Sequence, residues 1–313
     1  MQFLPTYGHL AKFDPPNDRG GEDKSSGHIS NDSLPSFFLI GHPVGHSLSP
    51  LIHNTAFAVL GLRGRYSALD VDSSAVGSAI ASIDGATVVG ANVTIPYKQA
   101  VIPYLEELTP TAKKAGAVNT IFRRDGLLVG ENTDVAGFLY GLRAPRAGNL
   151  VAKLPENPRV LILGSGGAAR AVAHACRVHL SASTVQIAAR NEATARGIEH
   201  IEFVDWEERK NAAQASDLIV NATPLGMHPS INASPLPDNM SFGPRHTVYD
   251  LIYNPDPTLL LEHAAGQGAV TIGGLAMLIG QAAAAFSIWT GQEMPVGEVE
   301  KIVREALHTK RRS

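Results

Sequence analysis

From residue 37 onward, short apolar runs alternate with amphipathic stretches, and this rhythm predicts strands that alternate with helices. In the first half, strands are predicted at 37–40, 66–71, 87–91, 118–122 and 127–130, the last two as a hairpin through Arg124-Asp125-Gly126. Helices are predicted at 49–60, 73–83, 98–108 and 133–142, the first with Ser49 as its N-cap and Pro50 in its first turn. Such alternation indicates an α/β fold with mainly parallel strands.

A second α/β run follows a break in this rhythm. Residues 144–158 contain three prolines and little periodicity, which is typical of a boundary between domains. Beyond them, strands are predicted at 159–163, 185–189, 217–221 and 248–251, and helices at 166–179, 275–289 and 296–307. Residues 1–35 are rich in Gly, Pro, Asp, Asn and Ser, so we expect a flexible N-terminal extension.

Length and composition narrow the class of protein. A chain of 313 residues exceeds one typical core, which favours two domains. A net charge of −3 shows no basic footprint for nucleic acid or an anionic membrane, and no apolar run is long enough to span a bilayer. The single cysteine, Cys176, lies in an apolar helical stretch and is expected to be buried and inert. We expect a cytoplasmic monomer or homodimer that binds a small molecule and, because the histidines lack ligand spacing, no metal.

A glycine-rich turn points to a dinucleotide. Val160-Leu161-Ile162-Leu163 runs into Gly164-Ser165-Gly166-Gly167-Ala168-Ala169, which opens a helix. In that context Gly164 allows a tight turn, Gly166 lets backbone N–H groups approach a pyrophosphate, and Ala169 lets helix and strand pack closely. The N-terminus of the helix then faces the phosphates.

The end of the next strand bears on the choice of nucleotide. An acidic residue there binds the ribose hydroxyls of NAD, whereas a cation accepts the 2′-phosphate of NADP. The sequence reads Ala189-Arg190-Asn191, so Arg190 favours NADP, with NAD as the alternative. Farther along, Asn221-Ala222-Thr223 follows a strand at the carboxyl end of the sheet and is placed to line the nicotinamide.

A second set of polar residues suits a small polyhydroxylated acid. Ser47 and Ser49 are one residue apart, so in an extended segment both hydroxyls point the same way and can grip one carboxylate. Lys98 and Asp134 each follow a strand, although taken singly a lysine there is usually solvated and an aspartate usually caps a helix. Strand-end loops on one side of a parallel sheet converge, and this set also includes Asn92, Thr94, Asn119 and Thr133.

These motifs resemble the shikimate dehydrogenase family over about residues 36–310. The stretches that match in order are 47–54, Asn92-Val93-Thr94 with Lys98, Asn119-Thr120, Asn132-Thr133-Asp134, 221–223, 249–255 and the helix that carries Gln281. The resemblance implies a substrate-binding α/β domain with a mainly parallel sheet, residues 36–135 plus 275–313. It also implies a Rossmann-type NADP-binding domain, residues 136–274.

The resemblance also implies roles for individual residues. Lys98 and Asp134 become the catalytic pair, and the substrate-binding residues are Ser47, Ser49, Asn92, Thr94, Asn119, Tyr253 and Gln281. The cofactor-binding residues are predicted to be Gly164, Gly166, Gly167, Ala168, Ala169, Arg190, Asn191, Asn221, Thr223 and Gly274. The chain departs from the family pattern at Thr194, which stands at the second basic position of the NADP signature.

The implied activity is the reversible reduction of 3-dehydroshikimate to shikimate with NADPH, and two alternatives remain open. The first is a quinate dehydrogenase that uses NAD, since the quinate branch shares nearly every motif. In that branch the second hydroxyl of the serine pair is often threonine, so Ser49 favours shikimate. The second is a non-catalytic sensor of the same acids, which degeneration of Lys98 or Asp134 would favour, and both residues are present.

Overall fold

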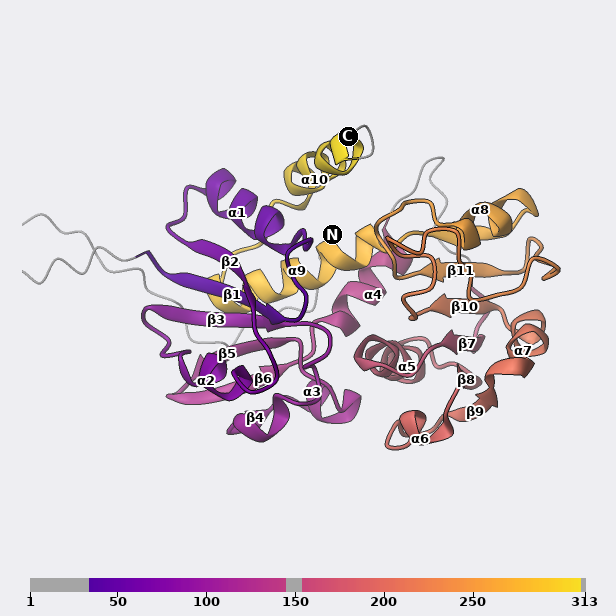
Figure 1. Ribbon diagram of the computed structural model, residues 1–313, viewed down its shortest axis with the longest axis horizontal. Coiled ribbons are helices and arrows are strands. Elements are labelled where there is room, and N and C mark those ends of the chain that lie inside the picture. Colours follow the sequence, from indigo (N-terminus) through magenta and orange to yellow (C-terminus); the bar gives the residue numbers. More distant parts are fainter. Residues whose placement is uncertain (1–33, 145–153, 311–313) are drawn as a thin grey trace, which may run out of the picture.

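The computed structural model describes residues 34–144 and 154–310, which form two α/β units, each built on a six-stranded sheet (Figure 1). The predicted extension 1–35 lies outside the described residues except for its last two positions, and most of the predicted boundary at 144–158 lies outside them as well. The α/β class predicted from the sequence is confirmed.

The first sheet has the strand order β2-β1-β3-β5-β6-β4. Its strands are β1 (Ser36–Gly41), β2 (Arg65–Asp70), β3 (Val88–Val93), β4 (Glu107–Leu108), β5 (Thr120–Arg124) and β6 (Leu127–Glu131). Only β5 runs against its neighbours, because a tight turn joins it to β6 in the predicted hairpin. Strands β1 and β3 are parallel neighbours, so their carboxyl ends lie on the same side of the sheet. There Gly41 and Val93 lead into the loops that carry Ser47 and Lys98.

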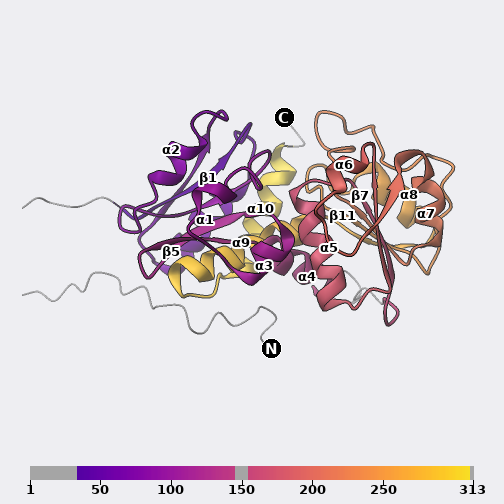
Figure 2. The same cartoon turned by 90° about the horizontal axis from the view of Figure 1, so that it is seen from below.

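Helices cover both faces of this sheet. Helix α4 (Asp134–Arg143) packs into the core of the second unit. The helices on the first sheet are α1 (Ser49–Leu60), α2 (Val76–Ala81), α3 (Pro110–Ala115), α9 (Leu275–Thr290) and α10 (Val296–Lys310). The last two return the chain to the first unit after the second sheet is complete, and α9 lies beside α4 between the two sheets in both views (Figures 1 and 2). Gly137 and Gly280 permit this contact, because a Cβ at Gly137 would lie 2.6 Å from Met277 O.

The second sheet is entirely parallel, with the order β12-β11-β10-β7-β8-β9. Its strands are β7 (Arg159–Leu163), β8 (Thr184–Ala189), β9 (Glu202–Asp205), β10 (Leu218–Asn221), β11 (Thr247–Asp250) and β12 (Val270–Ile272), and its helices are α5 (Gly167–His179), α6 (Glu192–Ala195), α7 (Arg209–Ala215) and α8 (Leu259–Gly266). After β7 the chain continues to β8 and β9 on one side of β7, and then to β10 on its other side. Such a switch point is where ligands bind in open α/β sheets.

Two local predictions are wrong. The helix predicted at 98–108 is instead a series of turns, a 3₁₀ helix at Ile102–Tyr104 and the strand β4. Pro103 has no N–H to donate along an α-helix, so the chain tightens and then becomes extended at Leu105 (φ −107°, ψ 141°). Ser49 is the first residue of α1 rather than its N-cap, which is Leu48 in an αR conformation without a side-chain bond.

Several short elements were not predicted, namely α3, α6 to α8, β4, β9 and β12. Each spans two to eight residues, too few for a periodic pattern to show.

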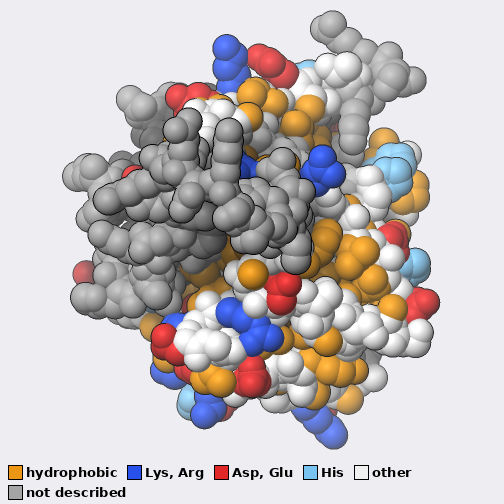
Figure 3. All heavy atoms as spheres, turned by 90° about the vertical axis from the view of Figure 1, so that its left-hand side faces the viewer, with side chains coloured by type: hydrophobic (Ala, Val, Ile, Leu, Met, Phe, Trp, Pro, Cys, Tyr) orange, Lys and Arg blue, Asp and Glu red, His pale blue; other side chains and the backbone are white. Residues whose placement is uncertain are grey.

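Cys176 is fully buried in α5, as predicted, and burial raises the pKa of its thiol. No helix within 34–144 and 154–310 is both long and apolar enough to cross a membrane. One face of the first unit shows basic and acidic side chains interspersed among apolar ones (Figure 3).

Candidate active site

Lys98 and Asp134 form an ion pair at the centre of the candidate site. Lys98 lies in the turn after β3, where its carbonyl accepts a hydrogen bond from Val118 N–H (2.7 Å), and Asp134 is the first residue of α4. Lys98 Nζ lies 2.5 Å from Asp134 Oδ2, and the two side chains are 15% and 6% exposed. Each of the two charges compensates the other in a place with little water, and removing either one would leave the other uncompensated. The pairing therefore fixes the position of the ammonium group.

Asn119 orients the carboxylate of this pair. Its Nδ2 donates to Asp134 Oδ1 (2.9 Å), the oxygen that Lys98 leaves free. Its Oδ1 accepts from the backbone N–H of Thr133 (2.7 Å) and from the hydroxyl of Thr120 (3.1 Å). Both Asp134 oxygens are therefore occupied, and the carboxylate faces Lys98 instead of capping α4.

Asn92 connects Asn119 to a residue that the sequence analysis missed. Asn92 Nδ2 donates to Asn119 O and to Thr120 Oγ1, both at 3.0 Å, so both amide hydrogens have acceptors within the protein. Its Oδ1 accepts from the hydroxyl of Tyr66 (2.7 Å), which is fully buried. Tyr66 is the one buried residue of the edge strand β2, and a buried tyrosine hydroxyl usually has a partner.

The two serines lie side by side at the start of α1. Ser47 Oγ donates to Ser49 Oγ (3.2 Å) and accepts from the backbone N–H of Ser49 (3.2 Å). Burial raises the pKa of Tyr66, and the Ser49 side chain opposes that shift. The hydrogen bond of the buried Tyr66 hydroxyl is to Asn92, another residue of the predicted substrate set.

Three other predicted substrate residues lie in different surroundings. Thr94 follows β3 and packs against Gly41, whose missing side chain leaves room for the threonine methyl. Tyr253 packs against the core of the first unit, and burial raises the pKa of its hydroxyl. Gln281 Nε2 donates to the carbonyl of Leu278 in its own helix (2.8 Å). Their contacts with a substrate stay predictions.

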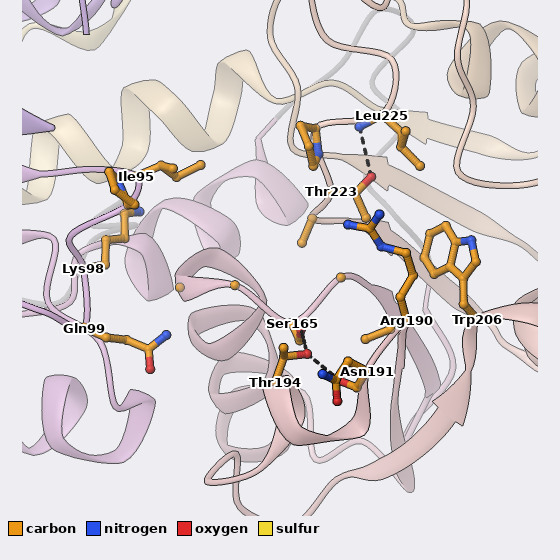
Figure 4. Close-up of a pocket in the computed structure, with 17 residues that line it drawn as sticks. Ile95, Lys98, Gln99, Ser165, Arg190, Asn191, Thr194, Trp206, Thr223 and Leu225 are labelled. Atoms are coloured by element: carbon orange, nitrogen blue, oxygen red, sulfur yellow. Dashed lines mark hydrogen bonds between the residues drawn. The ribbon is translucent and has the colours of Figure 1, made fainter. Parts of the chain in front are cut away.

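A cavity of about 1010 Å³ opens beside the ion pair and is lined by both units (Figure 4). Lys98 lines one side, and the glycine turn from Gly164 to Gly167 lines another. A Cβ at Gly167 would lie 3.0 Å from Lys98 Cδ, so the lysine stem runs directly against the start of α5. This contact places the ammonium and a dinucleotide-type turn in one cleft.

The glycine turn has the geometry that a bound phosphate requires. Gly164 adopts φ +102°, a region that favours glycine, and a Cβ there would lie 3.0 Å from Ala222 O. Gly166 precedes α5, whose first residue is Gly167, and the first N–H groups of a helix have no partner within it. Ala168 is half-buried and Ala169 is fully buried, so only a small side chain fits where α5 meets the sheet. These residues fit a dinucleotide.

The loop after β8 builds another side of the cavity, where it contributes Arg190, Asn191 and Thr194. Arg190 is exposed and extends across the cavity beside Trp206, toward Thr223 (Figure 4). Asn191 caps α6 by accepting from Ala193 N–H (2.9 Å). The hydroxyls of Ser165 and Thr194 lie 2.6 Å apart and join this loop to the glycine turn.

Asn221 shapes the opposite wall without lining it. Its Nδ2 donates to Asp250 Oδ1 (3.0 Å) and its Oδ1 accepts from the hydroxyl of Thr223 (2.7 Å). Thr223 lines the cavity together with Ala222, Pro224 and Leu225. Burial raises the pKa of Asp250 to about 6, although the Thr258 hydroxyl and Asn221 stabilise the charged form.

Gly274 lies behind this wall, where any side chain would collide with Leu251 O. Its N–H donates to Ile252 O (3.0 Å), so the structure gives it a packing role at the start of α9, and contact with the cofactor stays a prediction. Sequence reasoning missed other lining residues, namely Ile95, Pro96, Gln99, Trp206, Pro224 and Leu225. These are mostly apolar side chains that a search for polar chemistry passes over.

Comparison with known proteins finds relatives over most of the chain. The shikimate dehydrogenase substrate binding domain matches residues 39–121, and the shikimate 5′-dehydrogenase C-terminal domain matches residues 274–304. The shikimate dehydrogenase (NADP(+)) of Salinibacter ruber is 43% identical over 277 residues, which cover 85% of this chain and 95% of the relative. The chain belongs to the shikimate dehydrogenase family. The family predicted from the motifs is therefore confirmed.

Solved structures of the shikimate dehydrogenase family superpose on the whole fold. Shikimate 5-dehydrogenase from Thermus thermophilus, in complex with NADP(H) and shikimate, is 36% identical with a TM-score of 0.76, covering 87% of this chain and all of that one. Quinate dehydrogenase from Corynebacterium glutamicum, in complex with NAD, is 30% identical with a TM-score of 0.76, covering 87% and 99%. The predicted Rossmann-type fold is confirmed.

Proposed function

We propose that this protein catalyses the reversible NADP-dependent reduction of 3-dehydroshikimate to shikimate, and that Lys98 and Asp134 are its catalytic pair. The observation that carries the proposal is the position of this ion pair, with the Lys98 stem against Gly167 in the cavity that the glycine turn lines. Membership of the shikimate dehydrogenase family supports the substrate and the reaction.

The residues of the site account for the proton in this reaction. When bound, the nicotinamide exchanges a hydride with the carbon that bears the 3-hydroxyl group of shikimate. Reduction develops negative charge on the carbonyl oxygen, so a proton donor must lie within hydrogen-bond reach. Lys98 Nζ donates this proton and takes it back in the oxidation direction. Asp134, held by Asn119, keeps the ammonium in position.

The serine pair binds the carboxylate of the substrate in this proposal, a group that does not react. Alanine at Ser47 or Ser49 is therefore expected to raise KM for shikimate about tenfold each, with kcat changed less than about threefold. Steady-state kinetics at saturating NADP⁺ measure both constants. Ser74→Ala is the control, because the Ser74 hydroxyl bonds to Asp72 on an exposed loop. An unchanged KM in both site variants would place the carboxylate elsewhere.

Arg190 binds the 2′-phosphate of NADP in this proposal. Arg190→Ala is expected to raise KM for NADP⁺ about tenfold or more, the value of a charge-assisted hydrogen bond, while KM for NAD⁺ changes little. Arg196→Ala is the comparison, because Arg196 follows α6 and does not line the cavity. Equal effects of Arg190→Ala on the two nucleotides would remove Arg190 from phosphate recognition.

A quinate dehydrogenase that uses NAD is the second candidate function. Thr194 stands at the second basic position, and its hydroxyl bonds to Ser165 and to Asn191 O (2.6 Å), so among the described lining residues Arg190 is the one cation on the adenosine side. A single cation gives a weaker preference for the phosphorylated nucleotide. The structural likeness to an NAD-bound quinate dehydrogenase supports the same candidate.

One experiment decides between the two functions. Initial rates are measured on one purified sample with shikimate and with quinate, each with NADP⁺ and with NAD⁺. The proposed function predicts the highest kcat/KM for shikimate with NADP⁺. A higher value for quinate with NAD⁺ would replace it with the second candidate, and the absence of turnover in all four combinations would contradict both.

A further inference from the structure

Arg170 is a buried cation that the proposed mechanism does not use. It lies in the first turn of α5, three residues after Gly167, and is 7% exposed. Its guanidinium donates to three backbone carbonyls: Nη1 to Gly197 O (3.2 Å), and Nη2 to Arg196 O (3.1 Å) and Thr194 O (3.4 Å). Burial of this charge lowers the pKa of Arg170. Burying a charge costs free energy unless hydrogen bonds compensate it. Here the compensating carbonyls all belong to residues 194–197, so the guanidinium holds that segment against α5.

The held segment carries the adenosine side of the cavity. Residues 190–197 comprise the lining residues Arg190, Asn191 and Thr194, the short helix α6, and the turn at Gly197 (φ +79°). Four residues of helix contribute little stability by themselves. The N-terminal side of the segment is continuous with β8, and its C-terminal side is tied to α5 through the guanidinium of Arg170.

The same guanidinium lies beside the first unit. A Cβ at Gly116 would lie 3.5 Å from Arg170 Nη1. Gly116 is the αL residue that ends α3 (φ +61°), and three residues later Asn119 orients Asp134. Arg170 therefore lies between residues 190–197 and the stretch of chain that leads to Asn119. It is also on the helix whose first residue, Gly167, contacts Lys98.

We propose that Arg170 is a positioning residue that holds residues 190–197 in register with the glycine turn, so that the nucleotide is bound at both ends. Arg170 itself contacts neither nucleotide nor substrate. The inference rests on the proposed function, because it assigns residues 190–197 to the nucleotide. It separates the role of Arg170 from that of Arg190, which contacts the nucleotide directly in that function.

The test measures nucleotide affinity without turnover. Arg170→Met keeps the apolar stem and removes all three hydrogen bonds. We expect it to weaken the binding of NADP⁺, measured by calorimetry, about tenfold, because residues 190–197 would then have to be ordered when the nucleotide binds. KM for shikimate should change less than twofold, and hydrogen exchange at the amides of 194–198 should accelerate. Arg170→Lys, which keeps the charge with a smaller donor group, should fall between Met and wild type.

Arg177→Met is the matched control. Arg177 lies in the last turn of the same helix, at the opposite end from the glycine turn, and does not line the cavity. It also donates to a backbone carbonyl, Ala182 O (3.4 Å). It should leave the affinity for NADP⁺ and the exchange of 194–198 unchanged. If Arg170→Met does not fold, Arg170→Lys provides the measurement.

Three outcomes would overturn the proposal. An affinity for NADP⁺ equal to wild type in a folded Arg170 variant means that Arg170 does not position the nucleotide segment. An equal rise in both Michaelis constants with faster exchange throughout the chain means that its role is general stability. Wild-type protein that binds neither NADP⁺ nor NAD⁺ would contradict the proposed function itself, and with it this inference.

Discussion

Lys98→Ala is expected to lower kcat at least about a hundredfold, because a positioned acid–base group is typically worth about 10²–10⁴ in rate. The variant lacks the ammonium group that lies 2.5 Å from Asp134 Oδ2. It therefore has no lysine to donate a proton to the developing alkoxide. KM for NADP⁺ should change little, since the ammonium acts on the substrate oxygen. Steady-state rates of shikimate oxidation at saturating concentrations measure the effect.

Lys113→Ala is the matched control for this experiment. Lys113 lies in the last turn of α3, in the same unit, with an exposed side chain. Its replacement should leave kcat within about twofold of wild type, as surface substitutions usually do. A kcat near the wild-type value in Lys98→Ala itself would remove Lys98 from the mechanism and with it the central assignment.

Asp134→Asn is expected to lower kcat about a hundredfold or more with little change in the overall fold. Asparagine has nearly the same shape, but it offers one acceptor oxygen where aspartate offers two. Lys98 Nζ and Asn119 Nδ2 each donate to a different oxygen of Asp134, so in the variant one of these donors faces an NH₂ group. The ammonium then loses both its counter-charge and its fixed position.

Asp217→Asn tests whether loss of a charge pair by itself explains that result. Asp217 is 14% exposed and pairs with Arg159 (2.8 Å) in the second unit, away from the cavity. This variant should lower the melting temperature while kcat stays near wild type. The role assigned to Asp134 would fail if Asp134→Asn and Asp217→Asn had the same kinetics and differed only in stability.

Tyr66 and Arg170 show where inference from neighbouring residues stops. Tyr66 precedes Asn92 by 26 positions, and Arg170 lies 27 positions before Gly197. Nothing in the residues next to either one distinguishes it from an ordinary strand tyrosine or helix arginine. Their partners appear only after β2, β1 and β3 lie side by side and α5 packs beside the loop after β8. Non-local contacts of this kind are set by the fold.

The errors at 98–108 and at Ser49 each come from a contact that a helical pattern does not include. Apolar spacing after Lys98 favours a helix, but Pro103 interrupts it and β4 pairs with β6, a strand some twenty residues later in the chain. Serine is a residue type that favours N-caps, but the side chain of Ser49 accepts a hydrogen bond from Ser47 Oγ and the N-cap is Leu48. An N-cap preference of about 1 kcal/mol did not decide that boundary.

The amino-acid sequence by itself determined the α/β class and the glycine turn between strand and helix, because each depends on residues within one element or one turn. It also predicted the polar residues of the candidate site. Only the tertiary structure decided that Lys98 meets Asp134 against Gly167, and that Asn119, Asn92 and Asn221 turn their amides to protein partners. The reason is physical: the order of the strands in each sheet decides which loops share an edge, and that order follows from the packing of the whole chain.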